Sequence, residues 1–158
     1  MNASNSSSCS LEVRREAAAI RSASSDGGAD SRLGKTLDHT EVQALFRQAI
    51  AHDDDVAMRR GLEHVLGLNG ANGGLSAEQE YLLRHPDYVM EMPQSNERIR
   101  GREAMRAMQE AFPTPPNVRL RRVLGSGRTW VIEGVNDYDG DVWNVVLILE
   151  LDQDGLIR

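Results

Sequence analysis

The chain of 158 residues is poor in cysteine, in aromatic residues and in long apolar runs. Its single cysteine, Cys9, excludes an intramolecular disulfide and a cysteine-rich metal cluster. No apolar run approaches the roughly 20 residues that span a bilayer. The N-terminus also lacks the apolar core of a signal peptide. We therefore expect a cytoplasmic protein that does not associate with membranes.

The chain also has fewer basic than acidic residues. The net charge is -6 at pH 7, and residues 38–158 carry 13 basic and 20 acidic residues. Because binding to a phosphate backbone depends on Lys and Arg, we expect no nucleic-acid partner. A group of arginines is interpreted as an exposed edge that pairs with nearby acids: Arg98, Arg100, Arg102, Arg106, Arg119, Arg121 and Arg122.

Residue spacings typical of a metal site are not found either. His52 is followed by Asp53–Asp55, but adjacent residues do not all reach one ion, so this run predicts a surface turn. The aspartates from Asp137 to Asp141 imitate a calcium loop, but Ile148 occupies the twelfth position, where a bidentate glutamate is required. We therefore expect no metal and no cofactor.

The rest of the composition is typical of a globular protein, with 40% hydrophobic and 27% charged residues. Residues 1–37 are rich in Ser, Ala and Gly and hold few large apolar side chains, so we expect a disordered tail. Residues 38–158 are then long enough for one domain with its own core.

Capping residues and apolar periodicity predict three helices in the first half of this domain. The first begins after Asp38, with Glu41 three residues later as in a capping box, and ends near residues 52–55. The second ends at Gly67, and the third is a short helix that begins after Ser76.

The second half is rich in strand patterns. Apolar alternation and turn residues predict strands at residues 88–92, 98–100, 117–124, 129–137 and 142–151. One further helix follows Gly101. Helices followed by antiparallel strands predict an α+β domain with the helices on one face of a sheet. Asp154 and Gly155 predict one more hairpin turn, whose outgoing strand is only a stub, so we expect the domain to be incomplete at its C-terminus.

Period-two alternation assigns the strand side chains to two faces. The apolar and aromatic face is the candidate ligand pocket: Met90, Met92, Trp130, Ile132, Gly134, Asn136, Trp143, Val145 and Leu147. Core packing is an equally good interpretation of these residues. Glu91 and Glu133 should point to the opposite face, where Val146 and Ile148 indicate a homodimer interface.

Three segments resemble the SnoaL-like branch of the nuclear transport factor 2-like superfamily. They are HPDYVMEMPQS at residues 85–95, ERIRGREAMRAMQEAF at residues 97–112 and RTWVIEGVNDYDGDVWNVVLILELDQDG at residues 128–155. The resemblance covers about residues 36–158. It implies a cone in which helices wrap a strongly curved antiparallel sheet that ends in a pocket. Members include polyketide cyclases, a ketosteroid isomerase and limonene epoxide hydrolase, so it fixes no activity.

The resemblance also implies where such enzymes hold their catalytic groups. Met92 occupies the position of the isomerase's general base, and Leu147 that of its oxyanion donor. Gly134 and Asn136 occupy the positions of the hydrolase's Arg and Asp, and its second Asp falls beyond Arg158. Asn136 can hold a water or a carbonyl group, but it is no general base.

Three functions follow from these observations. The leading hypothesis is a domain that binds a small apolar molecule and has no assignable catalytic set. The second is an isomerase, polyketide cyclase or epoxide-hydrolase-like enzyme that uses Asn136 and a water. The third is a dimerising interaction module that uses the outer face of the sheet.

Overall fold

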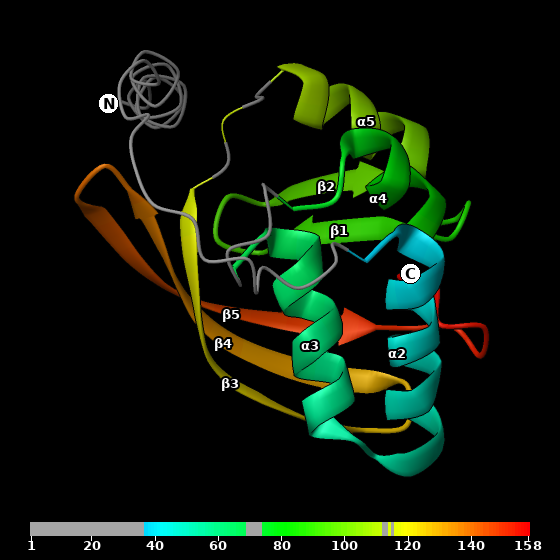
Figure 1. Cartoon of the computed structure of the whole chain (residues 1–158). Helices are drawn as coiled ribbons and strands as arrows, with labels where there is room; N and C mark the ends of the chain where they lie inside the picture. The colour runs from blue at the N-terminus through cyan, green and yellow to red at the C-terminus, as the bar shows by residue number, and fades with distance from the viewer. Residues whose placement is uncertain (1–36, 69–73, 112–113, 115) are drawn as a thin grey trace, which may run out of the picture.

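The computed structural model describes residues 37–68, 74–111, 114 and 116–158. Of the tail predicted at residues 1–37, residues 1–36 lie outside the described residues. Its last residue, Leu37, packs against the core and so belongs to the folded domain. The elements in chain order are α2 (His39–His52), α3 (Asp55–Leu66), α4 (Ala77–Leu83), β1 (Val89–Met92), β2 (Glu97–Arg100), α5 (Arg102–Ala111), β3 (Asn117–Ser126), β4 (Thr129–Tyr138) and β5 (Asp141–Glu150) (Figure 1). The predicted α+β order is confirmed. Within the described ranges, no helix is both long enough and apolar enough to cross a membrane.

The predicted helix starts are confirmed by their hydrogen bonds. The Asp38 carboxylate accepts from the backbone N–H of Glu41 at 3.0 Å, and the Glu41 carboxylate accepts from the N–H of Asp38 at 3.0 Å. The same reciprocal pair joins Ser76 and Gln79 at the start of α4, at 3.3 Å in both directions. These caps satisfy backbone donors that a helix leaves unpaired in its first turn.

Two antiparallel sheets follow from the strand pairing. β1 pairs with β2, and β3, β4 and β5 form a three-stranded sheet in that order. A tight turn joins β4 to β5 through Asp139 (φ 55°) and Gly140 (φ 100°). Two positive φ values in sequence are what a two-residue hairpin requires, so the predicted turn is confirmed.

The core lies where α2 and α3 cross one face of the three-stranded sheet (Figure 1). Val42, Phe46 and Ala49 of α2 are buried against Met58 and Leu62 of α3 and against the sheet. From the sheet, Val123, Trp130, Ile132, Leu149 and the following Leu151 join this cluster. Gly61 lets the two helices approach closely, because a Cβ at this position would lie 2.6 Å from the Phe46 ring.

The chain turns once more after β5, as predicted. Gly155 has a φ of 81°, and the Asp152 carboxylate accepts from the backbone N–H of Leu156 at 2.8 Å. Ile157 then makes two isolated bridges, antiparallel to Leu151 and parallel to Arg84. The residues that follow the turn therefore lie between the end of β5 and the start of β1.

Asp53 ties the corner between α2 and α3 to the turn between β3 and β4. Its carboxylate accepts from the backbone N–H of Gly127 at 2.7 Å. This bond, with a hydrogen bond from the side chain of Ser126, lowers the pKa of Asp53 below its ordinary value of 3.8. The carboxylate is therefore more acidic in the folded chain than in the unfolded one.

We expect Asp53→Asn to lose stability that depends on pH. Because the folded pKa is lowered, the contribution of Asp53 is fully present above the unfolded pKa and is lost as pH falls through the folded pKa. The variant should therefore be less stable than the wild type at about pH 7, with a gap that narrows below about pH 4. Urea unfolding at several pH values measures this, with Asp154→Asn as an exposed-turn control. A gap that does not change with pH would contradict the role of the Asp53 charge.

Candidate functional site

The candidate site is the face of β4 and β5 toward which α2 and α3 pack. The register places the following residues directly opposite one another: Trp130 and Leu149, Ile132 and Leu147, Gly134 and Val145, and Asn136 and Trp143. Because these positions alternate along both strands, they share one face of the sheet. The structure thus brings the predicted pocket residues of β4 and β5 together on one surface.

This face is closed at one end and open at the other. Trp130, Ile132 and Leu149 are buried under the two helices. Along the strands toward the β4–β5 turn, Leu147 is 47% exposed and Trp143 is 55% exposed. Core packing and a solvent-accessible apolar surface therefore occupy different parts of the same face.

The two predicted methionines lie on the other sheet. Met90 and Met92 are partly buried on β1, where they pair with Ile99 and Glu97 of β2. Within the described residues, the predicted pocket residues are therefore divided between two sheets whose strands do not pair with each other.

The polar groups of the face differ in what they already bind. The Trp130 indole N–H donates to the carbonyl oxygen of Gly127 at 3.0 Å, so it supports the β3–β4 turn. Trp143 exposes its side chain to solvent, and Asn136 is half-buried directly opposite it. No ionisable side chain lies on this face from Trp130 to Asn136 of β4 or from Trp143 to Leu149 of β5.

The nearby carboxylates lie on other surfaces and have partners. Glu91 is exposed and forms an ion pair with Arg98 across the β1–β2 hairpin. Glu133 of β4 accepts from the Arg122 guanidinium of β3 at 2.8 Å. Glu133 alternates with Ile132 and Gly134 and so lies on the face of β4 opposite the candidate site.

The two acidic runs considered as metal sites take part in turns and caps. Asp54 accepts from the backbone N–H of Ala57 at 2.9 Å and caps α3. Asp137 accepts from the backbone N–H of Gly140 at 2.7 Å in the β4–β5 turn. In the part of the chain that the structure describes, no three His, Cys, Asp or Glu side chains gather in a way that would hold a metal ion.

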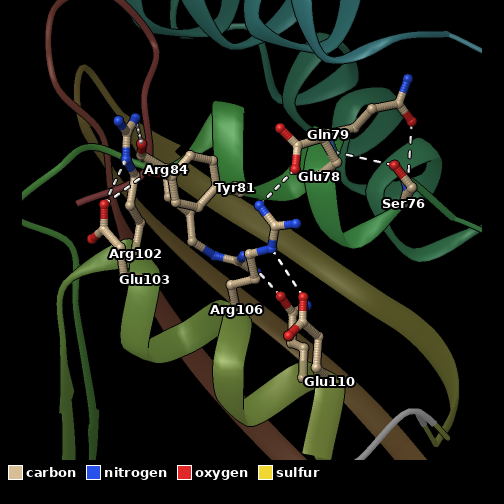
Figure 2. Close-up of polar contacts among 10 residues, drawn as sticks. Ser76, Glu78, Gln79, Tyr81, Arg84, Arg102, Glu103, Arg106 and Glu110 are labelled. Atoms are coloured by element: carbon tan, nitrogen blue, oxygen red, sulfur yellow. Dashed lines mark hydrogen bonds and ion pairs between the residues drawn. The ribbon is translucent and has the colours of Figure 1, made fainter.

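Arginines of α5 join that helix to α4 (Figure 2). The Arg102 guanidinium lies 4.3 Å from the centroid of the Tyr81 ring, and that of Arg106 lies 5.6 Å from it. Arg106 also forms ion pairs with Glu78 at 2.6 Å and with Glu110 at 3.0 Å. Arg106, like Arg98 and Arg122, pairs with acids, as the sequence predicted for this group.

A buried polar cluster at the start of β1 was not predicted. Arg84 is buried, forms an ion pair with Glu80 and donates to the side-chain oxygen of Gln109 at 3.0 Å. Gln109 donates in turn to Glu80 at 2.7 Å, which closes the cluster. Arg84 also lies over the ring of Tyr88, whose pKa is raised by burial. The i,i+4 spacing of Glu80 and Arg84 was the one sequence signal for this cluster.

The chain is similar to solved structures of one fold. A putative ketosteroid isomerase from Kribbella flavida is 21% identical, with a TM-score of 0.50 over 74% of this chain and 72% of that chain. An NTF-2 like protein of unknown function from Burkholderia xenovorans is 25% identical, with a TM-score of 0.48 over 75% and 76%. A steroid delta-isomerase from Pseudomonas aeruginosa is 19% identical, with a TM-score of 0.44 over 75% and 73%.

No protein-family model and no curated protein sequence matches the chain. The helices packed on a curved antiparallel sheet and the likeness to the Kribbella structure agree with the resemblance seen in the sequence. The chain therefore has the nuclear transport factor 2-like fold.

Proposed function

We propose that the open end of the β4–β5 face binds a small apolar molecule. The observation that carries this proposal is the exposure of Trp143 and Leu147 on the face whose other end, at Trp130, is buried. An apolar surface that continues into a core, with few polar groups, is typical of a ligand site. We place the ligand among cytoplasmic metabolites, in keeping with the location expected from the sequence.

The energetics favour an apolar ligand with one polar group. Covering apolar surface contributes about 25 cal/mol per Å² removed from water, and an exposed tryptophan offers a large area for this. The Asn136 amide lies opposite Trp143 and provides both a donor and an acceptor. A carbonyl, hydroxyl or epoxide oxygen on the ligand would match it.

Binding without acid–base catalysis fits the residues better than turnover does. Met92, Leu147 and Gly134 carry no proton-transfer group, and Asn136 is no general base. The enzyme alternative therefore depends on Asn136 and an ordered water alone. The interaction-module alternative has an observation of its own, because Val146 and Ile148 on the outer face are 66% and 65% exposed.

Ligand binding is tested by the melting temperature and tryptophan fluorescence with a panel of steroids, terpenoid epoxides and aromatic polyketides. Steroids are included because the Kribbella protein is described as a putative ketosteroid isomerase. A bound compound should raise the melting temperature and shift the emission of Trp143 to shorter wavelength. Trp143→Ala should abolish the thermal response, whereas Val146→Ala, on the opposite face, should retain it.

Two results would overturn the proposal. No thermal response to any compound, together with a stable dimer in sedimentation, would favour the interaction module. Turnover of a panel compound that Asn136→Ala abolishes, with the fold intact, would favour the enzyme.

A further inference from the structure

Arg59 of α3 brings a positive charge to the sheet that carries the candidate face. The helix packs on the same side of the sheet as this face (Figure 1). The Arg59 guanidinium donates to the backbone carbonyl oxygen of Leu120 in β3 at 3.2 Å. Leu120 lies directly opposite Gly134 of β4, and Gly134 lies directly opposite Val145 of β5. The charge is therefore held at a defined row of residues across the three strands.

This row lies between the buried and the open part of the face. Ile132, two residues before Gly134, is buried, and Asn136, two residues after it, is half-buried. Adjacent strands are about 4.8 Å apart, and two residues along a strand span about 7 Å. The Leu120 backbone that holds Arg59 therefore lies within about 10 Å of Asn136. One small molecule can span that distance.

The Arg59 guanidinium keeps donors for such a molecule. A guanidinium has five N–H donors. Within the described residues, its recorded contacts are the bond to Leu120 and an ion pair of Nε with the Glu63 carboxylate at 3.3 Å. The Arg59 side chain is 38% exposed, so a ligand can reach the remaining donors.

We propose that Arg59 binds the carboxylate of an apolar carboxylic acid whose body covers Trp143. This inference rests on the proposed ligand site and narrows its ligand class. Because β4 and β5 contain no cation, an anion on their face needs one from a helix. A guanidinium matches a carboxylate with two parallel hydrogen bonds, and the Asn136 amide can donate to the same group. Asp141, at the start of β5, repels an anion and so favours the orientation in which the carboxylate points toward Arg59.

The test compares two compounds that differ in charge but hardly in shape, adamantane carboxylate and adamantane carboxamide. Their affinities for the full chain are measured by calorimetry and by the fluorescence of Trp143. The wild type should bind the carboxylate about 10- to 100-fold more tightly, as expected for hydrogen bonds to a charged group. Arg59→Gln should remove this preference. Arg60→Gln, which alters an exposed arginine of the same helix, should retain it.

Glu63 provides a second, independent change at the same guanidinium. Glu63→Gln should strengthen binding of the carboxylate and not of the amide, because Arg59 loses a competing carboxylate. Arg59→Gln combined with Glu63→Gln should show no preference, which excludes repulsion by an unpaired Glu63 as the cause. The melting temperature of each variant without ligand shows whether the fold is intact.

The outcomes separate this inference from the proposed ligand site. Equal affinities of the two compounds in the wild type, both lost in Trp143→Ala, would overturn the role of Arg59 and leave the ligand site standing. A carboxylate preference that survives Arg59→Gln would assign the anion to another cation and would also overturn it. If neither compound binds, the role of Arg59 is wrong, and the panel of steroids, epoxides and polyketides decides the ligand site separately.

Discussion

Trp130→Ala lowers the free energy of unfolding by about 3–5 kcal/mol, the cost of removing a large aromatic side chain from a packed core. Trp130 is fully buried on β4 beneath α2 and α3, and its indole N–H donates to Gly127. The variant loses this packing, leaves a cavity and also loses the bond that closes the β3–β4 turn. The free energy of unfolding of such domains is only about 5–15 kcal/mol. The substitution therefore removes a large share of it. Urea unfolding followed by circular dichroism measures the loss.

Trp143→Ala is the matched control for this prediction. It removes the same side chain from the same face of the neighbouring strand, but Trp143 is 55% exposed. Its loss should cost less than about 1 kcal/mol, which also keeps the variant folded for ligand-binding experiments. Equal losses for the two variants would show that the core extends to the open end of the face, and the proposed ligand site would then be part of the core.

The two tryptophans also show what a sequence can and cannot predict. Period-two alternation placed both on one face, and the strand register confirms this. Which of them is buried depends on where α2 and α3 cross the sheet. That crossing is set by contacts between residues far apart in the chain, such as Phe46 with Gly61 and Met58 with the sheet. The sequence alone therefore could not distinguish the core residues of this face from the residues of the candidate ligand site.

Strand β3 is a second case in which the sequence does not predict which side chains are buried, and the cause is a single residue. The register shifts between Leu120 and Arg122, which leaves Arg121 as an extra residue in the strand. Val123 consequently faces the helices and is buried, while Leu124 lies 49% exposed. Strict alternation from Leu120 would have placed Leu124 on the buried face. A β-bulge moves the side chain of every later residue in the strand to the opposite face of the sheet. No glycine or other turn residue at this point in the sequence indicates the bulge.

Local signals, by contrast, were sufficient to predict where α2 and α4 begin. The spacings of Asp38 with Glu41 and of Ser76 with Gln79 predicted caps whose hydrogen bonds lie within four residues. The Arg84 cluster depends on a local contact and on contacts between residues far apart in the chain. Its pair with Glu80 is local, but its burial depends on Gln109 of α5 and on Tyr88, which only the fold brings together.

Arg84→Met lowers the free energy of unfolding by about 3 kcal/mol, near the low end of the range for breaking a buried ion pair. The Arg84 side chain is 7% exposed, and its removal leaves the largely buried Glu80 carboxylate with Gln109 as its only remaining partner in the cluster. The contact with the Tyr88 ring is lost as well. The junction of α4, α5 and β1 should therefore loosen first, which hydrogen exchange at the start of β1 detects.

Arg106→Met is the comparison that isolates burial as the cause. Arg106 also pairs with a glutamate four residues away, Glu110, but its side chain is 40% exposed. Water and salt screen this pair and the pair of Arg106 with Glu78, so losing both should cost much less stability than losing the buried Arg84 pair. Adding Glu80→Leu to Arg84→Met removes the unpaired charge and should restore part of the stability. If Arg84→Met and Arg106→Met cost the same, or if Glu80→Leu worsens the first, the buried pair is not what holds this junction together.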